Sequence, residues 1–278
     1  MKPNSILIIG CGDLGERVAG LLSASKFCVG GVCRHPERLS PLFTERYRAD
    51  YTLPGSLAFL EELAPDYVLT TFKPTQPSPQ GYQAGFPGAM ENLLSGLGTH
   101  RPKAIFMVSS TRALAEQAGG WVDEHSAVAQ SGYAATAIVE AEQRLQESGQ
   151  RACIVRFAGI YGDRNGRLLN RVRLGEICAQ QPVCYGNRIH RSDCAGMLVH
   201  LLNLDHLERA PLYLGVDNEP APQYEVQRWL ANEMGVNALP VEQAPRGHKR
   251  CSNRLITASG YRFLYPSYRE GYRAVMAS

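Results

Sequence analysis

The segment ILIIGCGDLGERVAGLL, residues 6–22, constrains the fold of this chain more than any other feature. A strand-sized apolar run leads through GxGxxG into a stretch with helical apolar spacing, which is the context that a dinucleotide-binding loop requires. Gly10 permits a tight turn, Gly12 lets the backbone approach a pyrophosphate without a Cβ, and Gly15 allows close packing of helix on strand. A purely structural glycine turn is the alternative.

The helix after this loop directs its unpaired N–H groups and the positive end of its dipole toward the phosphates. Cys11, Asp13 and Leu14 lie inside the loop, so we expect them to border the same site. Cys11 is expected to approach the ligand without reacting with it. The other seven cysteines are scattered singly and read as reduced, core-filling thiols.

Short apolar runs alternate with segments of helical periodicity through the first half of the chain, which is typical of βαβ units. The expected strands are 6–9, 28–33, 46–50, 67–72, 104–108 and 152–157, and the expected helices are 14–23, 56–63, 87–97 and 133–147. The proline-rich stretch 73–80 is expected to be a loop. The pattern predicts an α/β fold with a Rossmann-type, doubly wound parallel sheet.

The alternation fades beyond Gly159, where short pieces are punctuated by Gly, Pro and Asn. We therefore predict a dinucleotide-binding domain over residues 1–158. Residues 159–278 are predicted to form a smaller, mixed C-terminal substrate lobe, partly integrated with the sheet and capping its carboxyl edge, where open α/β sheets bind ligands.

Arginines follow the second expected strand, where NAD-selective folds carry an acidic residue for the adenine ribose. The strand ends VGGVCRHPERL, so Arg34 and Arg38 occupy this region. Guanidinium groups pair bidentately with a phosphate, and we therefore expect NADP to be preferred over NAD. Two solvated arginines with no ligand are the alternative.

Residues at the ends of the third and fourth expected strands face the same groove. Asp50 could accept a hydrogen bond from the adenine amino group, or be an ordinary loop acid. Thr71 and Phe72 place their backbone near the expected cofactor, while the sequence leaves the roles of their side chains open.

Composition excludes several function classes. The net charge of +3 is spread over 29 basic and 26 acidic residues without long basic runs, so nucleic acid is an unexpected partner. No apolar stretch reaches the length of a membrane span, and no secretory signal pattern is present. No cysteine and histidine spacing suits a metal. We expect a cytoplasmic protein that acts on a small molecule, and the sequence leaves its oligomeric state open.

Six local patterns in one order resemble the short-chain dehydrogenase/reductase superfamily, in particular its extended and atypical members grouped as NAD-dependent epimerase/dehydratases. Besides the glycine loop, these are FMVSST at 106–111, WVDE at 121–124, EAEQRL at 140–145, VRFAGIYGDR at 155–164 and RIHRSDCAG at 188–196. They extend over most of the chain up to about Leu202. The resemblance supports the Rossmann-type fold.

The resemblance also implies a catalytic Tyr with a Lys four residues later, and this chain lacks that pair. Judged from the spacing to EAEQRL, the two positions hold Ala134 and Ile138. Tyr133 would supply a phenol if the helix register differs by one residue, but Ala137 follows at the lysine spacing. A nearby ammonium normally helps the phenol to exchange its proton, and here it is missing.

Ser110 and Thr111, at the end of the fifth expected strand, match the hydroxyl position that holds a substrate oxygen in such enzymes. Hydrogen bonding within the strand-end turn is the alternative. Together with Tyr133 they are the catalytic candidates.

The resemblance implies further substrate contacts. Tyr161 and Arg164 match a strand-end segment on the nicotinamide side, and His190 lies where the C-terminal lobe returns to the cleft. His190 and Asp193 often pack and orient that lobe instead. Arg250 belongs to a basic cluster that is either a solvated face or an anionic substrate pocket, with members Arg246, His248, Lys249, Arg250 and Arg254.

Two functions remain open on this sequence. The chain is an NADP-preferring oxidoreductase or epimerase-like enzyme on a carbonyl, alcohol or sugar-like substrate, with atypical proton chemistry. Otherwise it is a catalytically degenerate dinucleotide-binding sensor or interaction protein. Turnover is uncertain, because the absent Tyr/Lys pair favours the second function and the cleft-bordering motifs favour the first.

Overall fold

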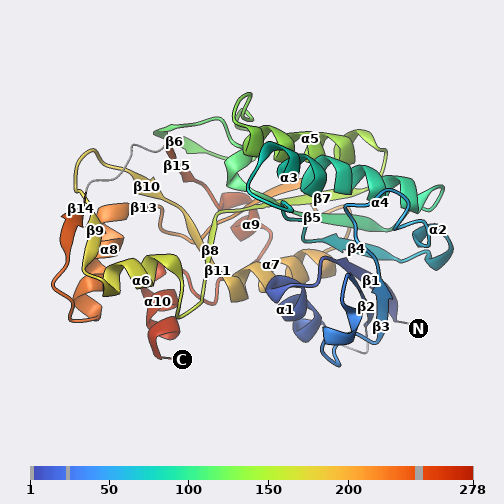
Figure 1. Cartoon of the computed structure of the whole chain (residues 1–278), viewed down its shortest axis with the longest axis horizontal. Coiled ribbons are helices and arrows are strands. Elements are labelled where there is room, and N and C mark those ends of the chain that lie inside the picture. The colour runs from blue at the N-terminus through green and yellow to red at the C-terminus, as the bar shows by residue number, and fades with distance from the viewer. Residues whose placement is uncertain (1–2, 23–25, 242–246, 278) are drawn as a thin grey trace. The chain divides into compact units, whose positions relative to one another are not determined.

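A seven-stranded parallel sheet is the centre of the fold, and it draws its strands from residues 4 to 215 of the protein (Figure 1). The computed structural model describes residues 3–22, 26–241 and 247–277. Within them, the strands follow the order β12-β7-β5-β4-β1-β2-β3. Their bounds are β1 (Asn4–Ile9), β2 (Phe27–Cys33), β3 (Glu45–Arg48), β4 (Tyr67–Thr70), β5 (Ala104–Ser110), β7 (Ala152–Phe157) and β12 (Leu212–Gly215).

Helices cover both faces of this sheet, so the predicted doubly wound Rossmann-type fold is confirmed. Figure 1 shows α3, α4 and α5 on one face and α1 and α7 on the other. The helices and shorter helical turns are α1 (Asp13–Leu21), η1 (Pro36–Arg38), α2 (Leu60–Leu63), α3 (Pro79–Gln83), η2 (Ala84–Gly88), α4 (Ala89–Leu97), η3 (Thr111–Ala113), α5 (Tyr133–Glu147) and α7 (Arg191–Asn203).

The sheet reverses its strand order at β1, which pairs with β2 on one side and with β4 on the other. Ile9 at the end of β1 is in register with Val32 of β2 and with Thr70 of β4. The carboxyl ends of three strands therefore meet here. Open α/β sheets bind ligands at such a switch point.

Three local expectations differ from the structure. The stretch 73–80 is not entirely loop, because Ser78 Oγ accepts a hydrogen bond from Gly81 N at 3.1 Å and caps α3, with Pro79 in its first turn. The expected helix 56–63 is α-helical only over Leu60–Leu63. Strand β12 was not predicted at all. Ser23, the last residue of the first expected helix, lies outside the described residues.

The described residues form two compact units. The first contains those of Met1–Leu114, Val128–Arg156 and Ala195–Tyr213, and the second those of Ala115–Ala127, Phe157–Cys194 and Leu214–Ser278. The linear division into 1–158 and 159–278 stays a prediction. Elements completing the chain are β6 (Ala118–Val122), β8 (Gly159–Tyr161), α6 (Arg167–Arg173), β9 (Glu176–Cys178), β10 (Tyr185–Gly186), β11 (Arg188–His190), β13 (Ala221–Pro222), α8 (Gln223–Glu233), β14 (Leu239–Val241), β15 (His248–Cys251), α9 (Arg254–Ala258) and α10 (Tyr268–Ala277).

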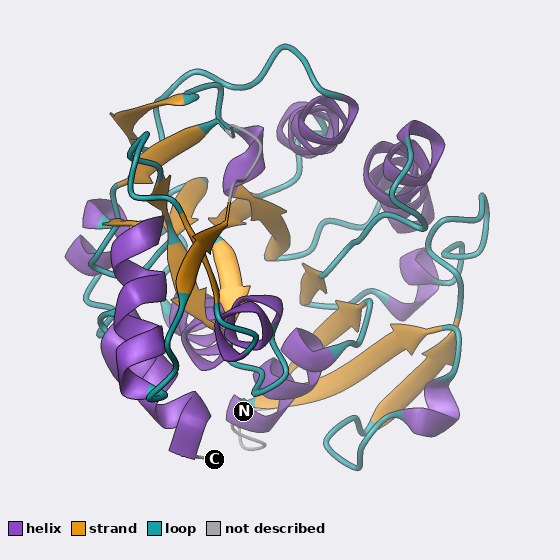
Figure 2. Cartoon of the chain, turned by 60° about the vertical axis from the view of Figure 1, so that its left-hand side comes forward, coloured by secondary structure: helices purple, strands orange, loops and turns teal. Residues whose placement is uncertain are grey.

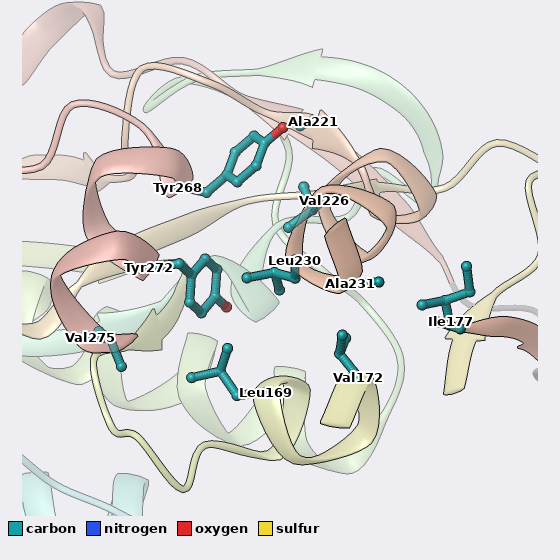
Figure 3. Close-up of a cluster of buried hydrophobic side chains, with 11 residues drawn as sticks. Leu169, Val172, Ile177, Ala221, Val226, Leu230, Ala231, Tyr268, Tyr272 and Val275 are labelled. Atoms are coloured by element: carbon teal, nitrogen blue, oxygen red, sulfur yellow. The ribbon is translucent and has the colours of Figure 1, made fainter. Parts of the chain in front are cut away.

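Short strands in separate pairs, rather than one large sheet, make up much of the second unit (Figure 2). Its apolar core lies among α6, β9, α8 and α10, and includes Leu169, Val226, Leu230 and Tyr272 (Figure 3). This unit therefore has a hydrophobic core of its own.

A buried ion pair connects α5 to strand β7 of the sheet. Arg156 Nη2 of β7 lies 2.6 Å from Glu142 Oε2 of α5, and both side chains are almost fully buried. Ser109 Oγ of β5 also donates to this carboxylate. A buried charge is tolerated when it is paired and hydrogen bonded, as here. The EAEQRL and VRF patterns thus have a structural role.

Candidate functional site: the glycine-loop cavity

The glycine loop connects β1 to α1, and its three glycines differ in what surrounds them. Gly10 has φ +92°, and a Cβ there would lie 2.9 Å from Thr71 Oγ1. A Cβ on Gly15 would lie 3.2 Å from Ile8 Cγ2 of the neighbouring strand, whereas one on Gly12 would meet nothing within 4 Å. Gly10 and Gly15 therefore serve the turn and the helix packing, and Gly12 borders open space.

A cavity of about 710 Å³ opens over this loop, and we call it the glycine-loop cavity. Most of the predicted cofactor residues line it: Gly10, Cys11, Gly12, Asp13, Leu14, Arg34, Arg38, Asp50 and Thr71. Gly15 and Phe72 do not. The cavity lies at the switch point of the sheet and at the N-terminus of α1, where bare N–H groups and the helix dipole favour an anion.

Basic side chains occupy the wall of this cavity near the end of β2. Arg34 and Arg38 are both exposed, and both line it, as does Lys73 after β4. The nearby acid, Glu37, is engaged elsewhere, because its Oε2 lies 2.9 Å from Arg48 Nη2. This end of the cavity is therefore electropositive.

Polar groups at the end of β3 hold their own loop together. Asp50 Oδ1 accepts hydrogen bonds from Thr52 N at 3.0 Å and from Thr52 Oγ1 at 2.7 Å. The Tyr51 ring lines the cavity and packs against Phe72, with 4.8 Å between ring centroids. Phe72 is buried, so its side chain supports the cavity wall from behind.

The thiol of Cys11 is a fixed part of the loop. Its Sγ donates to Ile8 O at 3.1 Å, and burial raises the pKa of Cys11 to about 12. Because the thiolate is the nucleophilic form, this side chain is unreactive at neutral pH. Thr71 Oγ1 donates to Gly10 O and fixes the same turn from the end of β4.

The three catalytic candidates lie in the first unit. Ser110 Oγ accepts from Arg112 N at 3.2 Å and caps η3, which includes Thr111. Tyr133 begins α5 with 49% of its surface exposed. Ile138, at the position matching the lysine, is only 3% exposed, so an apolar core residue stands there.

Tyr82 of α3 lies beside these candidates, and the sequence did not single it out. Its phenol oxygen accepts from Arg112 Nη1 at 2.8 Å, and its ring packs edge-on to Tyr133 with 5.5 Å between centroids. Tyr82 thus has a cationic neighbour of the kind that the absent lysine would supply. Its segment was expected to border a loop, so no local pattern indicated this contact.

The substrate candidates lie in the second unit, where two of the four meet. The ring centroids of Tyr161 and His190 are 5.3 Å apart, and burial raises the pKa of Tyr161 well above its usual value. Arg250 lies in another group, with its guanidinium 5.3 Å from the Trp121 ring and 4.7 Å from the Tyr185 ring. Arg164 is exposed. Of the basic cluster, Arg246 lies outside the described residues.

Asp193 fixes the C-terminal segment of the second unit. Its carboxylate accepts from Tyr261 Oη at 2.9 Å, from Leu264 N at 2.7 Å and from Tyr265 N at 3.0 Å. The ring of Tyr265 in turn lies 4.2 Å from that of His190. These contacts match the packing alternative for the His190 and Asp193 segment.

Among the described helices, none has the length and apolar composition needed to cross a bilayer. In the same part of the chain, no three His, Cys, Asp or Glu side chains are grouped as metal ligands. All eight cysteines are free thiols.

Solved structures resemble this chain over nearly its whole length, whereas no family model and no curated protein matches it. A structure assigned as an NAD-dependent epimerase/dehydratase from Methylobacillus flagellatus is 32% identical, with TM-score 0.83, over 99% of this chain and 98% of the other. Human epimerase family protein SDR39U1 (isoform 2), solved with NADPH, is 19% identical, with TM-score 0.77, over 99% of each chain. UDP-glucuronic acid 4-epimerase from Bacillus cereus, solved with NAD, is 16% identical, with TM-score 0.80, over 98% and 99%.

Proposed function

Because this chain belongs to the NAD-dependent epimerase/dehydratase family, within the extended and atypical short-chain dehydrogenase/reductases, we propose that it binds NADP in the glycine-loop cavity and acts on a small carbonyl, alcohol or sugar-like substrate. One observation carries the proposal. Gly12, at the N-terminus of α1, has no other atom within 4 Å of the position of a Cβ, and it lines the same cavity as Arg34 and Arg38. The printed ligands of the structural relatives, NAD and NADPH, agree with this class of cofactor.

The residues present fit such a cofactor. The N–H groups in the first turn of α1 would hold the pyrophosphate, which the bare Cα of Gly12 lets approach, and Arg34 with Arg38 would pair with the 2′-phosphate. Tyr51 and Asp50 would border the adenine. When bound, the cofactor supplies hydride transfer to or from a carbon atom of the substrate.

Proton transfer must accompany the hydride step, and the side chains near β5 are the candidates for it. Ser110 or Thr111 would orient the substrate oxygen, and a phenol at Tyr133 or Tyr82 would exchange its proton. Arg112 interacts favourably with negative charge that develops on the Tyr82 oxygen. Tyr161, Arg164, His190 and Arg250 remain our proposed substrate contacts, and we propose a cytoplasmic setting, in which free thiols are usual.

A dinucleotide-binding sensor without turnover is the second candidate. The observation in its favour is that the positions of the Tyr/Lys pair hold Ala134 and the buried Ile138. Both candidates need the cofactor, so they differ only in turnover.

Calorimetric titration with NADPH and with NADH tests the cofactor. We expect NADPH to bind at least tenfold more tightly, and we expect it to raise Tm by mass action. A panel of aldehydes, ketones and nucleotide sugars, followed by NADPH absorbance, then separates the two candidates, because any turnover eliminates the sensor. If the folded protein binds neither NADPH nor NADH, both candidate functions are excluded.

A further inference from the structure

A cavity of about 640 Å³ lies at the amino edge of the parallel sheet, and we call it the amino-edge cavity. Asn4, Phe27 and Tyr67, which line it, are the first residues of β1, β2 and β4. The proposed function places the cofactor at the opposite, carboxyl edge and leaves this cavity unused. All of its lining residues belong to the first unit, and its volume suits a small organic molecule.

Four strands of the sheet are preceded by a cation that lines the amino-edge cavity. Lys26, Lys103 and Arg151 directly precede β2, β5 and β7. Arg209 lies three residues before β12. Because the strands are parallel, their amino ends meet at one edge and bring together cations from distant parts of the chain. Among the described residues that line the cavity, Asp205 alone carries a carboxylate.

Two carboxylates at this edge are already engaged with other groups. Asp66 directly precedes β4, and its Oδ1 lies 2.9 Å from Lys103 Nζ. Asp205 Oδ1 accepts from Leu207 N at 2.9 Å and lies 3.2 Å from His206 Nδ1. Asp66 therefore compensates the charge of Lys103, and neither carboxylate forms an ion pair with the other three cations of the cavity.

Those three cations are in no ion pair within the part of the chain that the structure describes, and they are Lys26, Arg151 and Arg209. Lys26 and Arg151 are exposed, so a ligand reaches them without breaking an ion pair. Arg209 Nε and Nη2 donate to Leu201 O at 2.8 Å and to Leu204 O at 2.7 Å. These bonds occupy carbonyl groups at the C-terminal end of α7, which would otherwise disfavour an anion. The cavity therefore carries uncompensated positive charge.

Two of these cations lie at the same end of the cavity. Strands β12 and β7 are neighbours in the sheet, so Arg209 and Arg151 precede adjacent strands, whereas three strands separate β2 from β7. Guanidinium groups present several N–H donors in a planar fork that matches a phosphate. The Nη1 group of Arg209 is not used by its bonds at the end of α7. This end of the cavity is therefore suited to a phosphate dianion.

An aromatic ring lies farther along the cavity, two strands from β7 in the sheet order. It belongs to Tyr67, which is partly exposed and lines the cavity. The ring packs edge-on to Phe27, with 6.2 Å between ring centroids, and Lys103 Nζ lies 5.9 Å from its centroid. A partly exposed aromatic surface next to cations suits a ligand that joins a planar ring to an anionic group.

We propose that the amino-edge cavity binds a small phosphate monoester that carries a planar ring, with the phosphate on Arg151 and Arg209 and the ring on Tyr67. The site is separate from the glycine-loop cavity, so it does not rest on the proposed function. Phosphates without a ring and neutral ring compounds are the other outcomes of the test.

Calorimetric titration with three probes separates the two parts of such a ligand: phenyl phosphate, inorganic phosphate and benzyl alcohol, each at pH 8, where a phosphate monoester is a dianion. We expect phenyl phosphate to bind at least tenfold more tightly than either of the others. Arg151→Ala should weaken phenyl phosphate binding at least tenfold. Arg101→Ala, which removes an exposed arginine of the same unit outside the cavity, should leave it within twofold. Saturating NADPH should leave the affinity for phenyl phosphate unchanged.

No binding of phenyl phosphate overturns the proposal, as does equally tight binding of inorganic phosphate or of benzyl alcohol. Unchanged affinity in folded Arg151→Ala overturns it too. Displacement of phenyl phosphate by NADPH would place the probe in the glycine-loop cavity and contradicts a separate site.

Should Arg151→Ala not fold, Tyr67→Leu decides, because it removes the ring and keeps an apolar side chain. We expect that variant to bind phenyl phosphate at least threefold more weakly, and an unchanged affinity contradicts the site. If the protein binds phenyl phosphate but neither NADPH nor NADH, only the cofactor proposal fails.

Discussion

Two cavities of this protein are of similar size but are lined by different groups. The glycine-loop cavity lies at a helix N-terminus and carries the cations Arg34, Arg38 and Lys73. It is also lined by three carboxylates, which pair with Arg17, Ser40 and Thr52, and these are Asp13, Glu16 and Asp50. A cavity of about 660 Å³ in the second unit, which we call the second-unit cavity, is formed by residues 121–126, 217–220 and 251–258 and carries three carboxyl groups against one guanidinium. The balance of charged groups along the wall therefore differs between the two cavities.

They also differ in how the chain builds them. The core of the glycine-loop cavity comes from one contiguous segment, Gly10 to Leu14, whose conformation follows from local glycine chemistry. The second-unit cavity comes from three separate segments, the first of which, with Trp121, ends more than 90 residues before the second, with Asp217, begins. A binding site of contiguous residues leaves a local pattern, whereas a dispersed one does not.

The largest expected effect is on the contiguous cavity. Gly12→Val should weaken NADPH binding at least 100-fold, or about 3 kcal/mol, because the new side chain occupies the position of the pyrophosphate. A Cβ at Gly12 meets no protein atom within 4 Å, so the fold should tolerate it. Calorimetry measures the affinity. Gly20→Ala on the same helix is the matched control, with ordinary contact to Leu42, and should bind normally. Normal binding by Gly12→Val would place the cofactor elsewhere.

A smaller effect tests the buried carboxyl group of Asp217 in the second unit. Burial raises the pKa of Asp217 in the folded protein to about 7, above the ordinary value of 3.8 for an aspartate side chain. The folded protein therefore retains a proton that the unfolded chain has lost, and stability falls as pH rises between these two values. The charged and titratable groups that interact with Asp217 are Arg188, Glu219, Asp193, Tyr161 and Tyr272.

Asp217→Asn removes this dependence. The free energy of unfolding of the variant relative to the original should rise by about 2.5 kcal/mol between pH 5 and pH 8. Denaturant titrations at several pH values measure it, and Glu225→Gln, which removes an exposed carboxylate of the same unit, should show no such trend. If the difference in unfolding free energy between the variant and the original does not change with pH, the charge of Asp217 is already balanced by its neighbours in the folded protein.

The smallest effect concerns cofactor choice at the basic end of the glycine-loop cavity. Arg34→Ala should lower the ratio of NADPH to NADH affinity about tenfold, or about 1.4 kcal/mol, because one charge-assisted contact to the 2′-phosphate is lost. Arg101→Ala removes another exposed arginine of the first unit and should leave the ratio unchanged. An unaltered affinity ratio in Arg34→Ala would mean that Arg34 does not contact the 2′-phosphate.

The amino-acid sequence alone determined the parallel sheet, the glycine loop and the range of α5, because strand length, helical periodicity and glycine spacing are local properties of the chain. It also indicated Arg34 and Arg38, which directly follow a strand. It missed β12, which lies beyond Gly159, where the alternation of strands and helices has faded, and α3, whose Pro79 suits a first helical turn as well as a loop.

Only the tertiary structure decided which distant side chains meet. Arg112 lies 30 residues from Tyr82, and their hydrogen bond depends on the packing of α3 beside η3. The unsatisfied oxygen of Asp217 is likewise invisible in sequence, because burial and lack of a partner are set by every surrounding segment at once. Local chemistry fixes how a chain turns, while solvent exclusion and charge balance arise only when remote segments pack.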